Sequence, residues 1–247
     1  MTEQELEITI AGAGVQALLF RPDDIGVFPG VVFLTDIWGI RPANIAMAKR
    51  LSDKGFAVLV PNAFWRYSRI QPDGFETGDE QERHKRLMDL FASLTAPQQE
   101  EDGAAYVDFL LAQKGVAPGK VGVVGYCFSG MVALRTAAAA PDKVAAAASF
   151  HGGMLVTDRP DSPHKVLPRV KARLYFGHAV EDRSMTAAQI ETLEGCLRDW
   201  HGAFQSETYE GALHGWTVPG RDVYNELQAE RAFEKEVELF DATLKEA

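Results

Sequence analysis

The stretch KVGVVGYCFSGMVALRTAAAA (residues 120–140) joins two apolar segments through a turn rich in small side chains. Its pattern predicts a buried strand over residues 120–124 and a helix over residues 128–140. Between them, GYCFSG (125–130) spaces a glycine, a nucleophilic side chain and a small residue as a sharp strand-to-helix turn requires. Such a turn holds Cys127 at the carboxyl end of the strand, facing the positive end of the helix, which favours the thiolate over the thiol.

The small residues of this turn and the start of the helix complete a candidate nucleophile site. Gly125 and Ser129 allow the crossing backbones to approach closely, and the N–H of Phe128 is placed to donate to an oxyanion. The alternative is that Cys127 is a small buried hydrophobe, the usual fate of a free cysteine. The other cysteine, Cys196, borders an apolar stripe of a predicted helix, which favours a structural role there.

Outward from this stretch, extended and helical segments alternate along the chain, which predicts an α/β fold. We expect a mostly parallel, twisted sheet with helices on both faces, formed by a single domain over residues 1–247. Further strands are predicted over residues 6–10 and 15–21 (a hairpin), 31–35, 56–61, 144–150, 172–176 and 204–210 (an edge strand). Helices are predicted over residues 42–53, 81–95, 99–113, 186–200 and 223–245.

One long connection interrupts this alternation. Residues 62–80 are polar and contain Pro72, Gly74 and Gly78, which predicts a loop or a cap. The sequence leaves open whether this segment closes over a site as a lid.

Composition and charge exclude several classes of protein. Of the 247 residues, 46% are hydrophobic and 24% charged, as in globular proteins, and no apolar run is long enough to span a membrane. The acidic start MTEQELEITI does not resemble a secretory signal. A formal charge of −10 argues against nucleic-acid partners and against anionic membranes. Two widely spaced cysteines form no disulfide framework, so we expect a soluble, cytoplasmic chain with reduced thiols.

A nucleophilic cysteine needs a base, and the base needs an orienting acid. Asp182 lies in GHAVED (177–182) after one predicted strand, and His214 lies in GALHGW (211–216) after the last strand. Both therefore belong at the sheet edge that carries Cys127. The chain order Cys127, Asp182, His214 is the nucleophile–acid–base order of the α/β-hydrolase architecture. Any one of the three has an ordinary structural explanation, whereas three in order, each after a strand, are hard to obtain by chance.

No cofactor or metal is expected. The stretch VGVVGYCFSG contains no G-x-G-x-x-G, and the next strand ends without the acidic residue that would hold a ribose. The histidines show neither H-x-x-x-H nor H-E-x-x-H spacing, so a zinc site is not predicted.

With these residues in place, the chain resembles the dienelactone hydrolases, a family of α/β-hydrolases with a Cys–Asp–His triad. The resemblance covers nearly the whole chain, and the cysteine in the turn is its most specific element. Besides the three triad segments, it includes LTDIWG (34–39), PNAFWR (61–66) and DEQER (79–83).

The resemblance implies roles for matching positions. The backbone N–H groups of Ile37 and Phe128 would form the oxyanion hole. Asp36 would interact with the thiol and take its proton as the substrate binds. Arg83 would bind a carboxylate of the substrate; read on its own, it shares an apolar helix face and can equally be an arginine that extends its charge to solvent.

The chain departs from the family pattern at three positions. The family has glutamate where Asp36 stands, a second glycine where Ser129 stands, and a second anion-binding arginine where Val218 stands. Arg221 is nearby but out of register. These departures leave the hydrolase assignment in place and put the specific substrate in question.

Several aromatic residues occupy segments that are expected to approach the site. We expect Trp38, Tyr126 and Trp216 to contact the substrate, although aromatic residues at such places are as often core as lining. The wider group also contains Phe64, Trp65 and Phe150.

The sequence thus predicts a carboxylic ester hydrolase of the carboxymethylenebutenolidase type, as used in aromatic degradation. It would convert an enol lactone or activated ester, such as a dienelactone to maleylacetate, through a Cys127 acyl-thioester. The partner would be a small lactone or ester that can carry a carboxylate, and the chain a monomer or small homo-oligomer. The alternatives are a carboxylesterase, thioesterase-like or dehalogenase-like hydrolase of other substrate range, or a non-catalytic small-molecule receptor.

Overall fold

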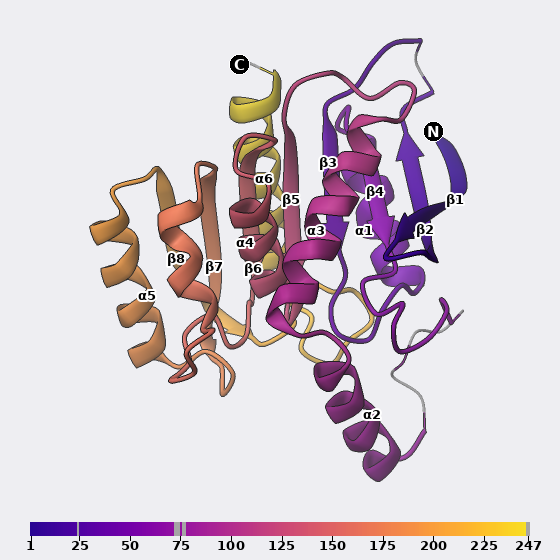
Figure 1. The fold of residues 1–247 in the computed structure, drawn as a ribbon. Helices are drawn as coiled ribbons and strands as arrows, with labels where there is room; N and C mark the ends of the chain where they lie inside the picture. Colours follow the sequence, from indigo (N-terminus) through magenta and orange to yellow (C-terminus); the bar gives the residue numbers. More distant parts are fainter. Residues whose placement is uncertain (24, 72–74, 76–77, 246–247) are drawn as a thin grey trace.

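The computed structural model describes residues 1–23, 25–71, 75 and 78–245. Its centre is an eight-stranded sheet in the order β1-β2-β4-β3-β5-β6-β7-β8, with helices on both faces (Figure 1). The strands are β1 (Thr2–Ile10), β2 (Ala13–Arg21), β3 (Gly30–Leu34), β4 (Ala57–Pro61), β5 (Val121–Tyr126), β6 (Val144–Phe150), β7 (Arg173–Glu181) and β8 (Phe204–Leu213). The helices are α1 (Pro42–Ser52), α2 (Glu80–Ala92), α3 (Ala96–Leu111), α4 (Ser129–Ala139), α5 (Ala187–Trp200) and α6 (Glu226–Phe240).

Strand direction changes only at the amino-terminal end of the sheet. β1 and β2 form the predicted hairpin, and β2 is antiparallel to β4. From β4 onward the strands are parallel, with β8 at the opposite edge beside β7. The carboxyl ends of β3, β5, β6, β7 and β8 therefore meet at one edge of the sheet, where ligands of such folds bind.

The sheet separates two hydrophobic cores. Helices α3, α4 and α5 cover one face, and α1 and α6 cover the other (Figure 1). The central strand β5 is buried along its whole length, and its side chains alternate between the two cores. Val123 and the partly buried Cys127 pack with the first core, whereas Val124 and Tyr126 pack with the second.

Several element boundaries differ from the sequence prediction. β5 continues to Tyr126, and β7 continues to Glu181 because its pairing with β8 extends past the apolar run. A 3-10 helix at Pro163–Arg169 was not predicted, and the carboxyl-terminal helix changes to a π-helix at Asp241–Lys245. In the 62–80 connection, Pro72 and Gly74 lie outside the described residues, and the described part before Glu80 contains turns and bends, without a strand or helix.

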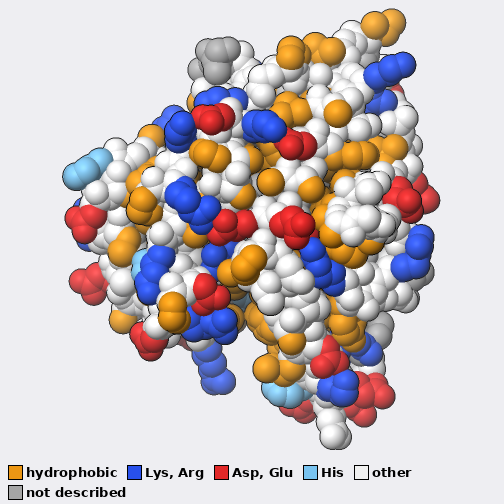
Figure 2. Space-filling view, viewed as in Figure 1, with side chains coloured by type: hydrophobic (Ala, Val, Ile, Leu, Met, Phe, Trp, Pro, Cys, Tyr) orange, Lys and Arg blue, Asp and Glu red, His pale blue; other side chains and the backbone are white. Residues whose placement is uncertain are grey.

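The face of the molecule seen in Figure 2 is mixed in charge. On the side that carries α3, α4 and α5, acidic and basic side chains alternate, and α2 projects from the body of the molecule (Figure 2). Among the helices of the described residues, none combines the length and the apolar character needed to cross a bilayer.

A buried carboxylate is the most unusual polar feature of the second core. Glu236 of α6 is 2% exposed, and its Oε2 accepts a hydrogen bond of 2.8 Å from the Tyr126 hydroxyl. Burial raises the pKa of Glu236 to about 7, against the smaller opposing effects of the Tyr126 hydrogen bond and the Arg50 charge. The folded protein therefore holds a proton that the unfolded chain releases near its ordinary pKa of 4.5.

We predict that Glu236→Gln stabilises the protein at alkaline pH. Because the folded state binds more protons between pH 4.5 and 7, the wild-type free energy of unfolding falls across that window. Glutamine carries no charge, so the variant should gain up to about 3 kcal/mol at pH 8 and almost nothing below pH 4.5. Urea unfolding at both pH values measures this difference. A gain that is equal at both pH values would show that packing, not ionisation, is responsible.

Candidate active site

Cys127 lies on a strained turn between β5 and α4. Its φ of +56° is in the left-handed region, which non-glycine residues seldom adopt. This tight turn is possible because residue 125 has no side chain. A Cβ at Gly125 would lie 2.0 Å from the carbonyl oxygen of Ser129. Gly130 is equally constrained, since a Cβ there would lie 2.2 Å from Ser149 Oγ. The sharp turn predicted from GYCFSG is therefore present, with Gly130 as a second required glycine.

A histidine that the sequence analysis did not assign to the site holds this turn. His151 follows β6 directly, and its Nδ1 accepts a hydrogen bond of 3.0 Å from the Cys127 N–H. Its Nε2 lies 2.7 Å from Thr217 Oγ1. Burial, followed by the nearby His214 and Arg221 charges, lowers the pKa of His151 well below its ordinary value. The ring is thus neutral, which Nδ1 requires in order to accept.

His214 joins the cysteine to the acid. It follows β8 directly, its Nε2 lies 3.0 Å from Cys127 Sγ, and its Nδ1 lies 2.6 Å from Asp182 Oδ2. The three residues predicted from chain order are therefore connected in one hydrogen-bonded line. They come from the ends of three parallel strands, β5, β7 and β8.

Asp182 is fixed by its own neighbour. The backbone N–H and the hydroxyl of Ser184 donate to Asp182 Oδ1 at 2.7 and 2.6 Å, which leaves Oδ2 for His214. Burial would raise the pKa of Asp182, but the hydrogen bond and charge of His214, with the Ser184 bonds, lower it below its usual value. Ser184 is a positioning residue that the sequence analysis missed. Its signal was available, because a serine two residues after an aspartate commonly closes such a turn.

The charges of the site favour a protonated His214. Burial alone would lower the pKa of His214, but the negative charge of the Cys127 sulfur, the Asp182 hydrogen bond and the Asp182 charge together raise it to about 10. The imidazolium thus lies between the Asp182 carboxylate and the Cys127 sulfur. This arrangement can hold a sulfur anion at neutral pH and return a proton to a leaving group.

A cavity of about 780 Å³ opens over the sulfur. Cys127 and His214 lie in its wall, and the remaining lining is mostly apolar. It includes Ile37, Trp38, Leu87, Phe91, Phe128, Met131, Met154 and Leu213. A cavity of this size accepts a small organic substrate.

The two residues expected to form an oxyanion hole both line this cavity. Phe128 follows Cys127 and opens α4, so its N–H belongs to the helix start, where N–H groups have no partner within the helix. Ile37 lies in the loop after β3, beside the same cavity. Their positions suit two donors that converge on one oxygen.

Asp36 is directed away from the role that the family resemblance implies. Its Oδ1 and Oδ2 lie 2.5 and 2.7 Å from the guanidinium of Arg41, and Oδ1 also accepts the N–H of Trp38. Both charged side chains are buried, and such a pair is costly to break. In this structure the partner of the Cys127 sulfur is His214, and the Asp36 carboxylate serves to order the loop that carries Ile37.

The positions that could bind a carboxylate of the substrate differ in their exposure to solvent. Arg83 is exposed on α2 and lines a separate hollow of about 680 Å³ that shares Trp38 and Leu87 with the main cavity. Val218, which stands where the family has its second anion-binding arginine, is fully buried. Arg183, next to Asp182, lines the main cavity itself and was not considered from the sequence.

Two of the three aromatic residues expected to contact the substrate lie elsewhere. Trp38 lines the cavity, but Tyr126 points to the opposite face of the sheet because side chains alternate along β5. Trp216 is fully buried and packs against His151 and Tyr209. Among the described residues, no three His, Cys, Asp or Glu side chains gather as a metal ion would require.

The chain is similar to known proteins over nearly its whole length. A model of the dienelactone hydrolase family matches residues 15–244. A relative from Synechocystis sp. named "Putative carboxymethylenebutenolidase" is 28% identical over 246 residues, which are 96% of each chain. The carboxymethylenebutenolidase of Rhodococcus opacus is 27% identical over 233 residues, covering 92% of this chain and 86% of that one.

The fold has a close counterpart among solved structures. The crystal structure of a Klebsiella pneumoniae protein described as "Putative Dienelactone Hydrolase" superposes with a TM-score of 0.84 and 21% identity, over 97% of this chain and 98% of the other. The predicted α/β-hydrolase fold is confirmed.

Proposed function

Because the chain belongs to the dienelactone hydrolase family, we propose that it hydrolyses enol lactones and aryl esters through a Cys127 acyl-thioester. The observation that carries this proposal is the line from Cys127 Sγ through His214 to Asp182, at 3.0 and 2.6 Å, in the wall of an apolar cavity. Membership of a hydrolase family alone would leave the nucleophile open. The hydrogen-bonded line supports Cys127 in that role.

In the first half of the reaction, the Cys127 thiolate attacks the acyl carbon, and the carbonyl electrons move onto its oxygen. The N–H groups of Ile37 and Phe128 stabilise that oxyanion, and each such donor is typically worth about 3 kcal/mol in the transition state. When the intermediate collapses, the C–O bond breaks and the departing oxygen leaves as the enol or phenol with a proton from His214.

In the second half, neutral His214 takes a proton from water, and the resulting hydroxide attacks the thioester. Collapse of the second intermediate releases the acid and returns the thiolate, with the proton on His214. Asp182 stays ionised throughout and stabilises the imidazolium at each stage. Asp36, held by Arg41, takes no proton in this scheme.

The sulfur nucleophile narrows the range of substrates. A thiolate leaves a tetrahedral intermediate more readily than an alkoxide, so an alkyl ester would mostly return to reactants. A stabilised enolate or phenolate can leave the tetrahedral intermediate in competition with the thiolate, so the reaction proceeds to the acyl-thioester. Enol lactones and aryl esters therefore suit this site better than simple alkyl esters.

The cavity also suggests where a substrate carboxylate would bind. Arg183 lines the main cavity beside the triad, and Arg83 lines the adjoining hollow. Both supply positive charge, beside Asp79 and Glu80 in the hollow and Glu181 and Asp182 in the cavity. A carboxylated lactone fits this arrangement even though Val218 replaces the second arginine of the family.

We predict that turnover depends strongly on the leaving group. The wild type should hydrolyse phenyl acetate at least about 100-fold faster, in kcat/KM, than ethyl acetate, because only phenolate competes with the thiolate for expulsion. Spectrophotometric and pH-stat assays measure the two rates, and a dienelactone provides the third substrate. Equal or faster hydrolysis of the ethyl ester would contradict a thiolate nucleophile.

A further inference from the structure

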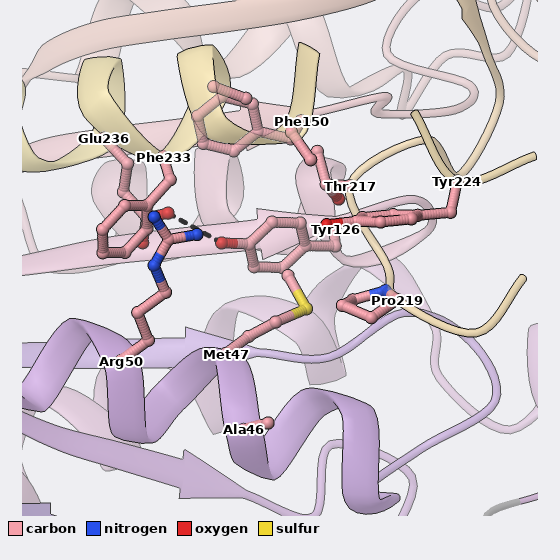
Figure 3. A pocket seen from close by; sticks show the side chains of 12 residues that line it. Ala46, Met47, Arg50, Tyr126, Phe150, Thr217, Pro219, Tyr224, Phe233 and Glu236 are labelled. Atoms are coloured by element: carbon pink, nitrogen blue, oxygen red, sulfur yellow. Dashed lines mark hydrogen bonds between the residues drawn. The ribbon is translucent and has the colours of Figure 1, made fainter. Parts of the chain in front are cut away.

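A second cavity lies on the opposite face of the sheet from Cys127 Sγ. It measures about 130 Å³ and is enclosed by α1, α6, the end of β5 and the segment that joins β8 to α6 (Figure 3). We call it the rear chamber. Its walls are mostly apolar and aromatic, and they include Met47, Phe150, Tyr224 and Phe233. None of these residues lines the catalytic cavity.

The rear chamber contains one carboxylate that forms no ion pair within the described residues, although Arg50 also lines the chamber and its charge acts on this carboxylate. Glu236 lines the chamber, and its Oε2 accepts the hydrogen bond of the Tyr126 hydroxyl; within the described chain, Oε1 is buried and has no hydrogen-bond partner. Arg50 is close by in Figure 3, but its guanidinium is held by both carboxylate oxygens of Glu230. A buried carboxylate oxygen that lacks a donor favours a ligand that can supply one.

The aromatic walls add a second preference. Ring faces attract cations, and the Phe233 ring already carries the Arg50 guanidinium 3.8 Å from its centroid. Tyr126, Phe150 and Tyr224 present further rings to the same space. A carboxylate among aromatic side chains is the chemistry that recognises an organic ammonium ion.

We propose that the rear chamber binds a small primary ammonium ion, with Glu236 as its counterion and the surrounding rings as its apolar contacts. The ammonium group would donate to Oε1, which has no other partner in the described chain, and the alkyl part would lie against Met47 and Phe150. This site is separate from the triad, so it stands whether or not the proposed hydrolysis is correct.

The rear chamber is also connected to the turn that carries Cys127. Thr217 lines it, and Thr217 Oγ1 bonds to His151, whose other nitrogen accepts the Cys127 N–H. Two hydrogen bonds thus connect the chamber wall to the backbone of Cys127. Amide resonances of Tyr126 and Thr217 are therefore suitable local probes of an occupant.

The test is a titration with propylammonium against its neutral isostere 1-propanol at pH 8. Protein alkylated at Cys127 with iodoacetamide is used, so that the catalytic cavity is blocked. We expect propylammonium to bind with a dissociation constant on the order of 1–10 mM, seen by calorimetry and by shifts of the Tyr126 and Thr217 amides. Equal binding of 1-propanol, or no binding of propylammonium, would overturn the proposal.

Two variants assign the binding to the carboxylate. Glu236→Gln keeps the shape of the side chain and should weaken propylammonium binding at least about tenfold, since the counterion is lost. Glu234→Gln removes the same charge from an exposed position of α6 and should bind as the wild type does. Unchanged affinity in Glu236→Gln, or an equal loss in both variants, would show that Glu236 is not the counterion.

The wild type provides a check that needs no substitution. The groups around Glu236 are the Tyr126 hydroxyl, the Arg50–Glu230 ion pair and Tyr224; burial raises the pKa values of both tyrosines above their ordinary range. Glu236 is thus the group expected to titrate near neutrality, and affinity for propylammonium should fall about tenfold from pH 8 to pH 6. Affinity that is constant across this range would contradict the proposed ion pair.

Discussion

Replacing Cys127 with alanine is expected to lower kcat for phenyl acetate by a factor on the order of 10⁴ to 10⁶. The substitution removes the atom that forms the acyl-thioester, so only binding and oxyanion stabilisation remain, as when other hydrolases lose their nucleophile. Alanine has the same backbone requirements as cysteine at a φ of +56°, so the strain at the turn does not change. The activity of purified wild type and variant, followed by phenol release, measures the effect.

Cys196 provides the matched control. It is the other free cysteine, partly buried on α5 and packed against the first core. Cys196→Ala should keep full activity, and iodoacetamide should label the wild type once, at Cys127, with loss of activity in step with labelling. Labelling mainly at Cys196, or substantial activity in Cys127→Ala, would remove the proposed mechanism and leave only the fold and family.

The triad could be predicted from sequence because the sheet is parallel. Residues that directly follow parallel strands meet at one edge, so Cys127, Asp182 and His214 had to lie near one another once their strands were recognised. Chain order then predicts which of them acts as nucleophile, acid and base. The same reasoning applies to His151, which follows β6 directly. The sequence pattern raises His151 only as a possible metal ligand, so its contact with the Cys127 N–H is not predicted.

Tyr126 and Trp216 were expected to contact the substrate but do not line the cavity, and for Tyr126 the reason can be read from the sequence. Tyr126 and Cys127 are neighbours at the end of a strand, and neighbouring side chains of a strand point to opposite faces. Placing Cys127 toward the catalytic cavity therefore places Tyr126 behind the sheet, where it meets Glu236. That alternation was available from sequence, although the partner on α6, 110 positions along the chain, was not.

Other features depend on loop geometry that no periodic pattern encodes. The pairing of Asp36 with Arg41 joins two residues across an irregular connection between β3 and α1. The family resemblance instead implies that Asp36 contacts the Cys127 thiol. The Asp36 carboxylate pairs with the buried Arg41 guanidinium and not with the Cys127 sulfur, and sequence spacing alone does not determine this pairing.

The last prediction concerns the proton of His214. In the wild type we expect the rate of Cys127 alkylation by iodoacetamide to stay nearly constant between pH 6 and 9. The pKa of His214 is raised to about 10 while the sulfur is negative, so the imidazolium keeps its proton across this range. In His214→Asn the sulfur loses this neighbouring positive charge, and a cysteine thiol without such a neighbour ordinarily ionises near pH 8.5. Alkylation at pH 6.5 should then fall about 100-fold, and kcat by roughly 10³-fold or more.

The exposed His201, at the end of α5, is the control for removing a histidine. It adopts the left-handed conformation that asparagine tolerates, so His201→Asn should leave both the alkylation profile and kcat unchanged. A wild-type rate that rises about tenfold per pH unit, as in His214→Asn, would mean that the proton resides on sulfur at rest. His214 would then act only after a substrate binds, and the 3.0 Å contact would join a neutral imidazole to a thiol.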